Sequence, residues 1–205
     1  LKDGQTIAVA TQLGDFTGAA MALTREIIRQ RRRGLHLVCV PGGSMQVDML
    51  IGAGCVSTIQ AGTVSLYEHG AAPRWMQAQR DGSLQLKEST CPAIEAGLTA
   101  SARGTPFMPV RGILGSDVLA MRRHEWKVID NPYAKDDPIL VVPAITPDYA
   151  LLHAPLVDEH GNAWIGRRTS IALMLHASRG ALVTYEKRHA GSLFDDPAMA
   201  AGTIP

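Results

Sequence analysis

Glycine and hydroxyl residues follow the second of several short apolar runs in this chain. The run at residues 35–40 is followed by Pro41, Gly42, Gly43 and Ser44, and a helical pattern begins directly afterwards. Two glycines let the backbone fold tightly, a serine caps a helix, and the positive end of a helix attracts an anion. The segment predicts either a site for a phosphate or carboxylate group or simply a well-capped helix.

A second group of polar side chains follows the next apolar run, at residues 56–61. Here the chain carries Ser65, His69 and Arg74. A hydroxyl donates a hydrogen bond to a carboxylate and the basic side chains supply positive charge, so the three together suit an acidic ligand. Taken singly, each is more often a surface side chain or a hydrogen-bonded core residue, and both interpretations stay open.

A carboxylate stands at the end of the fourth apolar run. Glu88 follows residues 84–87 and precedes a helix expected to begin at Pro92. The positive end of a helix keeps such a carboxylate ionised, so Glu88 could act as a base or orient a substrate. The alternative is an ion pair with Arg103 or Arg111 that braces the fold.

Two other loops contain residue types that are common in functional sites. Residues 158–162, with the sequence DEHGN, combine two carboxylates, an imidazole and an amide, which suit a metal or acid–base site. The same residues form a good Asx turn with Gly161 at positive φ, and this structural role is favoured. The glycines of residues 11–18 lack the spacing of a dinucleotide fingerprint, so a structural turn is an equal alternative to a ligand loop there.

The elements that would position these residues alternate between strands and helices. Alternation over about 25–35 residues predicts an α/β fold, doubly wound, with a mainly parallel sheet and helices on both faces. Ligands bind such sheets beyond the carboxyl ends of the strands. Strands are expected at residues 6–10, 35–40, 56–61, 84–87, 139–145, 149–157 and 181–185, and helices at residues 20–33, 45–53, 92–102 and 170–178.

Composition limits the class of protein. The chain has 205 residues, of which 46% are hydrophobic, and a formal net charge of +1. We expect one domain over residues 1–205, and the charge gives no case for a nucleic-acid partner. Cys39, Cys55 and Cys91 are spaced for neither a disulfide framework nor a metal site and fit a cytoplasmic protein. No apolar run approaches the ~18–20 residues that span a bilayer, so no membrane partner is expected.

One combination of motifs resembles a known family. Residues 139–166 (ILVVPAITPDYALLHAPLVDEHGNAWIG), residues 104–111 (GTPFMPVR) and residues 115–117 (GSD) together resemble the α subunit of family I coenzyme A transferases, most nearly the glutaconate CoA-transferase type. The resemblance covers about residues 3–185. It implies the CoA-transferase fold, a coenzyme A thioester as substrate and no permanently bound cofactor. Because α subunits of this family are longer, both ends of this chain are expected to be trimmed or disordered.

The resemblance also implies roles for the candidate residues. Gly42, Gly43 and Ser44 would lie on the ligand side of the sheet, and Ser65 would stand near the acyl substrate with His69 as an accessory cation. Glu88 occupies the place of an acidic-polar motif of the family. Residues 158–162 correspond to a structural signature, and residues 11–18 lack the adjacent glycine pair that family members carry there.

A catalytic nucleophile is missing from the sequence. Family I transferases use a glutamate that forms a covalent thioester with coenzyme A, and no glutamate of this chain matches its motif. The resemblance therefore implies a β subunit that supplies the glutamate, expected in an α2β2 assembly that binds an acyl-CoA and a carboxylic acid. A CoA-thioester hydrolase on the same scaffold and a non-enzymatic ligand sensor are the alternatives.

Overall fold

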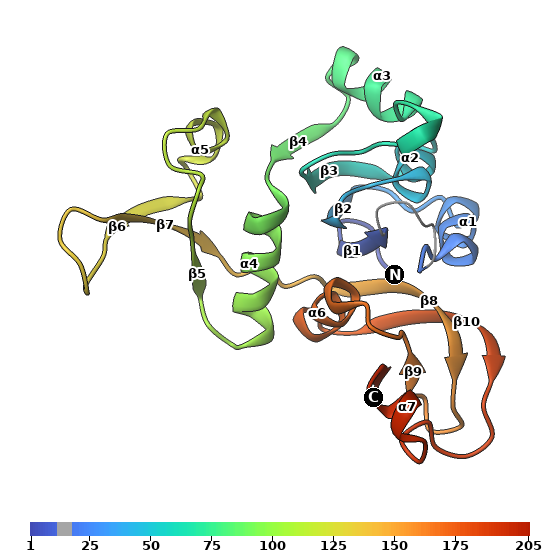
Figure 1. Cartoon of the computed structure of the whole chain (residues 1–205). Coiled ribbons are helices and arrows are strands. Elements are labelled where there is room, and N and C mark those ends of the chain that lie inside the picture. The colour runs from blue at the N-terminus through green and yellow to red at the C-terminus, as the bar shows by residue number, and fades with distance from the viewer. Residues whose placement is uncertain (12–17) are drawn as a thin grey trace.

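The central element of the fold is a sheet. The computed structural model describes residues 1–11 and 18–205, and eight strands of this part form one sheet in the order β11-β9-β8-β1-β2-β3-β4, with β10 also paired to β8 (Figure 1). These strands are β1 (Thr6–Thr11), β2 (Leu35–Pro41), β3 (Val56–Ala61), β4 (Gln85–Glu88), β8 (Tyr149–Val157), β9 (Ala163–Trp164), β10 (Ala181–Arg188) and β11 (Thr203–Ile204).

Neighbouring strands of this sheet run mainly in one direction. β1 pairs in parallel with β2 and β8, β2 with β3, β3 with β4, and β10 with β8. Within the described part of this sheet, the antiparallel pairs all involve the short strand β9, which pairs with β8 and β11. The predicted mainly parallel, doubly wound α/β fold is confirmed.

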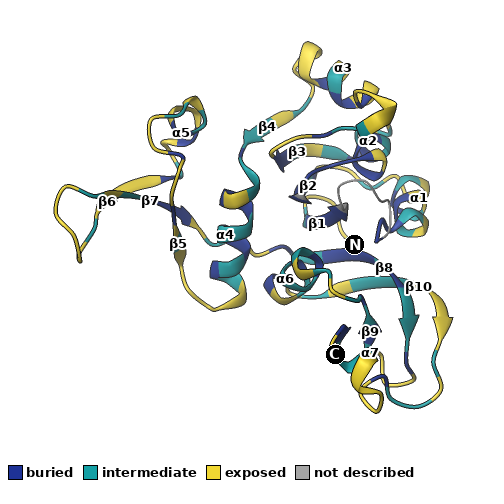
Figure 2. Cartoon of the chain, in the orientation of Figure 1, coloured by how far each residue is buried: buried dark blue, intermediate teal, exposed yellow. Residues whose placement is uncertain are grey.

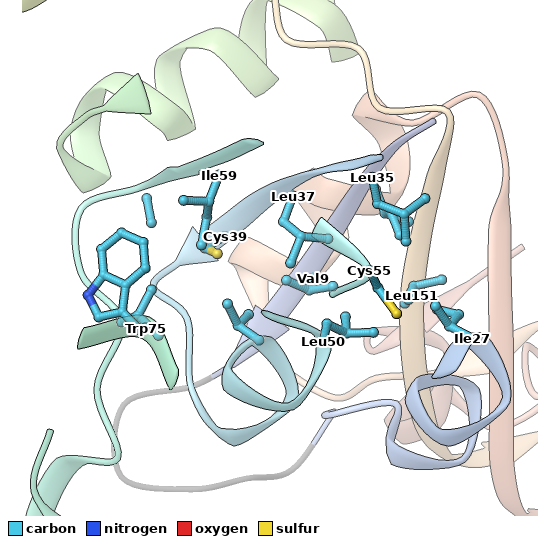
Figure 3. Packing of buried hydrophobic residues seen from close by; sticks show 14 of the residues in the cluster. Val9, Ile27, Leu35, Leu37, Cys39, Leu50, Cys55, Ile59, Trp75 and Leu151 are labelled. Atoms are coloured by element: carbon cyan, nitrogen blue, oxygen red, sulfur yellow. The ribbon is translucent and has the colours of Figure 1, made fainter. Parts of the chain in front are cut away.

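Helices cover both faces of the sheet. One core receives side chains from α1 (Met21–Arg29), α2 (Met45–Gly52) and α3 (Pro73–Asp81), and the opposite core receives them from α4 (Cys91–Ala102) and α6 (Thr169–Ala177). Successive residues of a strand point to opposite faces, so Leu37 packs in the first core and Val38 in the second. Figure 3 shows Ile27, Leu50 and Trp75 converging on the first face.

A second, three-stranded sheet projects beside α4 (Figure 1). It has the order β5-β7-β6, both pairs are antiparallel, and the strand β6 is exposed along its whole length (Figure 2). Its elements are β5 (Phe107–Val110), β6 (Lys127–Asp130) and β7 (Pro138–Pro143), with α5 (Asp117–Arg122) between β5 and β6.

This sheet corrects one prediction. The run at residues 139–145 was expected as a strand of the parallel sheet, whereas β7 lies at the centre of the antiparallel one. Leu140 and Val142 are buried against its own small core, and Val141 on the opposite side is also buried. A continuous apolar run indicates burial on both faces but carries no information on the direction of its neighbours.

One predicted helix ends earlier than expected, and several helices of the structure were not predicted. α1 ends at Arg29, and Arg31 takes a positive φ of 54° in the turn that follows. α3 begins at Pro73, in a segment expected to be a loop, and its N–H groups at Arg74 and Trp75 both donate to the carboxylate of Asp48 at 2.9 Å. The cap comes from a residue distant in sequence, and the local signals, Pro73 at the first position and Gly82 after the last, are compatible with a loop as well. The short helices η1 (Tyr67–His69), α5 (Asp117–Arg122) and α7 (Pro197–Ala200) were also not predicted.

No helix in residues 1–11 and 18–205 is long and apolar enough to cross a membrane.

Candidate functional site

The parallel strands β2, β3 and β4 end at one edge of the main sheet, and the described residues that follow them lie there. In the register of the sheet, Thr11 pairs with Pro41 and Ala61 pairs with Glu88, so the strands β1 to β4 end close together. The predicted residues that follow β2, β3 and β4 therefore share this edge. We call Gly42, Gly43, Ser44, Ser65 and Glu88 the carboxyl-edge site.

The glycine turn and the serine loop are joined directly. The N–H of Gly43 donates to the carbonyl of Thr63 at 2.9 Å, and the N–H of Ser65 donates to the carbonyl of Gly43 at 3.0 Å. A Cβ atom on Gly43 would lie 3.0 Å from Val64 Cγ2 and 3.2 Å from Cys39 Sγ, which is closer than side chains normally pack. Glycine at this position lets the turn after β2 and the loop after β3 lie against each other.

The two serine hydroxyls of the site have different surroundings. Ser44 is fully buried and caps α2, with its Oγ accepting from the N–H of Met45 at 2.6 Å. Ser65 is half-buried, and its Oγ accepts from the N–H of Tyr67 at 3.0 Å. Among the described residues the Ser65 hydroxyl donates to no acceptor, so its proton is available to a ligand. Ser44 therefore fulfils the expected cap, whereas Ser65 keeps a donor for chemistry.

His69 and Arg74 lie away from the glycine turn. The His69 side chain is 67% exposed in η1, and its Nε2 is 3.8 Å from Glu68 Oε1. The stem of Arg74 lies against Gly52, at the opposite end of α2 from the cap at Ser44. The structure thus brings Gly42, Gly43 and Ser65 together but gives little support to His69 and Arg74 as accessory cations.

The carboxylate of Glu88 makes no hydrogen bond or ion pair with the described residues, although its residue is half-buried. Arg111, one of its two expected partners, instead forms an ion pair with Asp137. Glu88 follows Leu86 by two residues, so both point to the face of the sheet that carries α2. The alternative that Glu88 braces Arg103 or Arg111 is wrong for the described structure.

A buried arginine, Arg122, donates a hydrogen bond to the backbone at the end of β4. Arg122 is 3% exposed, and its Nη1 donates to the backbone carbonyl of Glu88 at 2.7 Å. Its Nη2 pairs with Glu125 at 2.6 Å, and its guanidinium lies 4.8 Å from the centre of the Trp126 ring. Lys87 adds a second ion pair to Glu125 at 3.0 Å.

These cations control the ionisation of Glu125. Burial by itself would raise the pKa of this carboxyl, but the hydrogen bonds from Lys87 and Arg122 and their charges outweigh burial and lower the pKa to about 2. The cluster was not predicted from the sequence. Its local signal is an arginine three residues before a glutamate and four before a tryptophan, a spacing that is common in proteins and specific to no function.

The loop at residues 158–162 forms the Asx turn that the sequence analysis favoured over a metal or acid–base site. The Asp158 carboxylate accepts from the N–H groups of His160, Asn162 and Leu193 and from the Asn162 side chain, at 2.7–3.0 Å. Burial would raise its pKa, but these hydrogen bonds hold the pKa well below the ordinary aspartate range. Gly161 takes the expected positive φ of 92°. Of the loop at residues 11–18, residues 12–17 lie outside the described part of the chain.

Comparison with known proteins decides the family. A sequence model described as coenzyme A transferase matches residues 1–170. The chain belongs to the coenzyme A transferase family. Membership confirms the resemblance drawn from residues 104–166.

The curated relatives of this chain include proteins named as hydrolase subunits and proteins named as CoA-transferase subunits. The cholesterol ring-cleaving hydrolase IpdA subunit of Rhodococcus jostii is 33% identical over 148 residues, which are 70% of this chain and 49% of that protein. The A subunit of the 3-oxoadipate CoA-transferase of Pseudomonas knackmussii is 30% identical over 195 residues, covering 91% of this chain and 66% of that protein. The chain spans about half the length of the first curated relatives that it matches.

Solved structures agree on the fold. A variant of the decarboxylase AibA/AibB superposes with a TM-score of 0.82 at 28% identity, covering 94% of this chain and 72% of that one. Glutaconate coenzyme A-transferase from Acidaminococcus fermentans gives a TM-score of 0.87 at 23% identity, covering 97% of this chain and 67% of that one. The second likeness shows the fold alone.

Proposed function

We propose that this chain is the α subunit of a heteromeric CoA-transferase that moves coenzyme A between carboxylic acids. The observation that carries the proposal is the direct bonding of the Gly43 turn to the Ser65 loop at the edge where β4 presents Glu88. Such an edge is where parallel α/β sheets bind ligands. Family membership supports the reaction class, and the relative named as an A subunit supports a heteromer.

The reaction divides between two subunits in this proposal. A glutamate of the β subunit first attacks the acyl-CoA carbonyl and expels the CoA thiolate, which leaves an acyl anhydride. The thiolate then attacks the enzyme carbonyl of the anhydride, which releases the first acid and leaves an enzyme-CoA thioester. The acceptor acid reverses these two steps and departs as the new acyl-CoA.

This chain would bind and orient the substrates. The Gly42–Gly43 turn is buried against residues 63–64, so it would hold the loop that carries Ser65 in position for a ligand. The free hydroxyl proton of Ser65 would donate to a substrate carboxylate or thioester oxygen. Glu88, whose carboxylate has no partner among the described residues, would orient the acceptor or the partner's nucleophile.

The test is activity with and without the partner. The purified chain alone should show no CoA transfer, and co-purification with the β subunit should restore it, with an expected α2β2 assembly that buries more than ~2,000 Å² per stable interface. Full turnover by the single chain would show that it contains a complete active site and would overturn the proposal.

A CoA-thioester hydrolase is the second candidate. Two observations favour it: the IpdA relative is named as a hydrolase, and the Glu88 carboxylate has no partner within the described residues, which leaves it available to accept a proton. In that case Glu88 would activate water, and no covalent thioester would form.

Substitution of Glu88 separates the two functions. For a transferase, Glu88→Gln should lower kcat/KM about tenfold to a hundredfold, roughly 1.4–2.7 kcal/mol, and the enzyme-CoA thioester should still be trapped by borohydride. For a hydrolase, the same change should cost about 10²–10⁴ in kcat, with no thioester on either subunit. Glu159→Gln, at an exposed position of the structural turn, is the matched control. An unchanged rate for Glu88→Gln would remove Glu88 from both mechanisms.

A further inference from the structure

A polar cavity of about 190 Å³ lies on the opposite face of β4 from the direction of Glu88. Its walls come from the main sheet, with His36, Gln60 and Lys87, and from the segment around the three-stranded sheet, with Arg122 and Trp126. Lys87 directly precedes Glu88, so the two side chains point to opposite faces. The cavity is therefore separate from the carboxyl-edge site.

Several polar groups in the cavity wall lack partners. Gln60 is 6% exposed, and its amide makes no hydrogen bond with the described residues. The Nε2 atom of His36 and the Nε atom of Arg122 are buried without a hydrogen-bond partner among these residues. Burial of an unpaired polar group destabilises a protein, so a ligand that satisfies even one of these groups gains binding free energy from it.

The cavity also carries an excess of positive charge. Lys87 and Arg122 supply two cations against the one carboxylate of Glu125, which leaves a single positive charge when His36 is neutral. Burial is the main cause that lowers the pKa of His36 to about 4, and the charge of Lys87 lowers it further. His36 is therefore neutral near pH 7, and the local field favours an anion.

We infer that this cavity is a second ligand site, for a small monocarboxylate. The ammonium group of Lys87 has donors beyond the one used by Glu125, and the Gln60 amide adds an N–H, so the two match a carboxylate. The volume equals roughly six water molecules, which fits an acid of a few carbons. Val142 and Ile145 in the same wall supply apolar surface for its alkyl chain.

Binding of butyrate tests this inference on the full chain or its complex and requires no enzymatic activity. Butyrate should shift the indole N–H signal of Trp126 in a saturable manner, with the signal assigned by Trp126→Phe. Butyramide, of the same shape without the charge, should cause no saturable shift. Failure here would leave the proposed transferase function untouched, because the carboxyl-edge site lies on the other face.

Two variants and one control identify the residues. Lys87→Met keeps the aliphatic stem and should weaken butyrate binding at least tenfold, and Gln60→Glu should do the same by placing a negative charge in the wall. Lys127→Met, on the exposed strand β6, should bind as wild type. Absence of saturation by butyrate, an equal response to butyramide, or wild-type affinity in both cavity variants would overturn the assignment.

Discussion

At the scale of single residues, the chain separates side chains that hold the site from side chains that remain available for chemistry. The side chains of Ser44 and Asp48 accept hydrogen bonds that cap α2 and α3, and the Asp158 carboxylate accepts the hydrogen bonds of its own turn. Within the described residues, the Ser65 hydroxyl can still donate a hydrogen bond, and the Glu88 carboxylate can still accept one. Residue type alone could not distinguish these groups in the sequence, because the difference lies in the partners that folding supplies.

Gly43 is the residue where the geometry of the carboxyl-edge site is most constrained. We expect Gly43→Ala to destabilise the protein by about 1–3 kcal/mol, because the new methyl group would press on Val64 and Cys39 and push the two loops apart. Displacement of Ser65 should also lower kcat/KM of the complex. Urea denaturation and steady-state kinetics measure the two effects.

Gly62→Ala is the matched control for this change. A Cβ atom there would meet Cys91 at an ordinary 3.5 Å, so its stability should stay within about 0.5 kcal/mol of wild type. Equal stability of the two alanine variants would contradict the close approach inferred at Gly43.

His36 should make stability depend on pH. The unfolded chain takes up a proton on this side chain near pH 6.5, whereas folded His36 does so only near pH 4. Between these values the unfolded state holds more protons, so the free energy of unfolding should fall as the pH decreases through this window, by up to roughly 3 kcal/mol. His36→Gln should flatten this part of the curve in urea titrations at pH 4–7.

The exposed His69 provides the control for that titration. His69→Gln should leave the slope as in wild type. A wild-type slope in His36→Gln would assign the pH dependence to other groups and contradict the neutral state of the half-buried His36 side chain.

At the scale of elements, the strands and helices around the main sheet could be predicted because each has a local pattern. Residues 56–61 and 149–157 were predicted with the bounds that β3 and β8 have in the structure. The antiparallel sheet β5-β7-β6 could not be predicted in the same way. Its strands are short, β6 has polar ends, and only pairing between distant segments defines it.

The helix α4 joins the two sheets through a glycine. The carbonyl of Gly97 accepts from the N–H of Ile145 at 2.9 Å, and a Cβ atom there would lie 2.6 Å from Ile145 Cδ1 and 3.0 Å from the Pro143 carbonyl. Alanine normally stabilises a helix interior by about 0.5–1 kcal/mol relative to glycine. Here we expect Gly97→Ala to destabilise instead, by about 1–3 kcal/mol, because the backbone carbonyl cannot move aside easily.

Chemical denaturation of Gly97→Ala shows whether the substitution raises or lowers the free energy of unfolding. The mid-helix control Thr99→Ala lies on the same helix. It removes a methyl group and the hydroxyl that donates to the backbone carbonyl of Glu95, so its cost should be near 1 kcal/mol or less. Stabilisation of the chain by Gly97→Ala would show that α4 and the segment 143–145 are not in close contact.

At the scale of the whole molecule, the main sheet gathers the predicted site residues at the carboxyl ends of β2 to β4, and no glutamate in the sequence matches the nucleophile of the family. The family, the mainly parallel sheet and the shared edge of Gly42, Gly43, Ser65 and Glu88 followed from the sequence and its resemblance. The cavity behind β4 did not, because its lining residues come from separate segments whose meeting depends on the long-range packing of two sheets.

The most direct test of the central claim is to locate the covalent intermediate. The chain and its β subunit, purified together, are incubated with a panel of acyl-CoA thioesters, trapped with borohydride or hydroxylamine, and analysed by mass spectrometry, with carboxylic acids as acceptors in parallel assays. We predict that the complex transfers coenzyme A and that the isolated chain does not. The trapped glutamate should lie on the β subunit, and this chain should carry no modified glutamate. A trapped thioester on a glutamate of this chain, or turnover without the partner, would contradict the assignment of the chain as half of a transferase site.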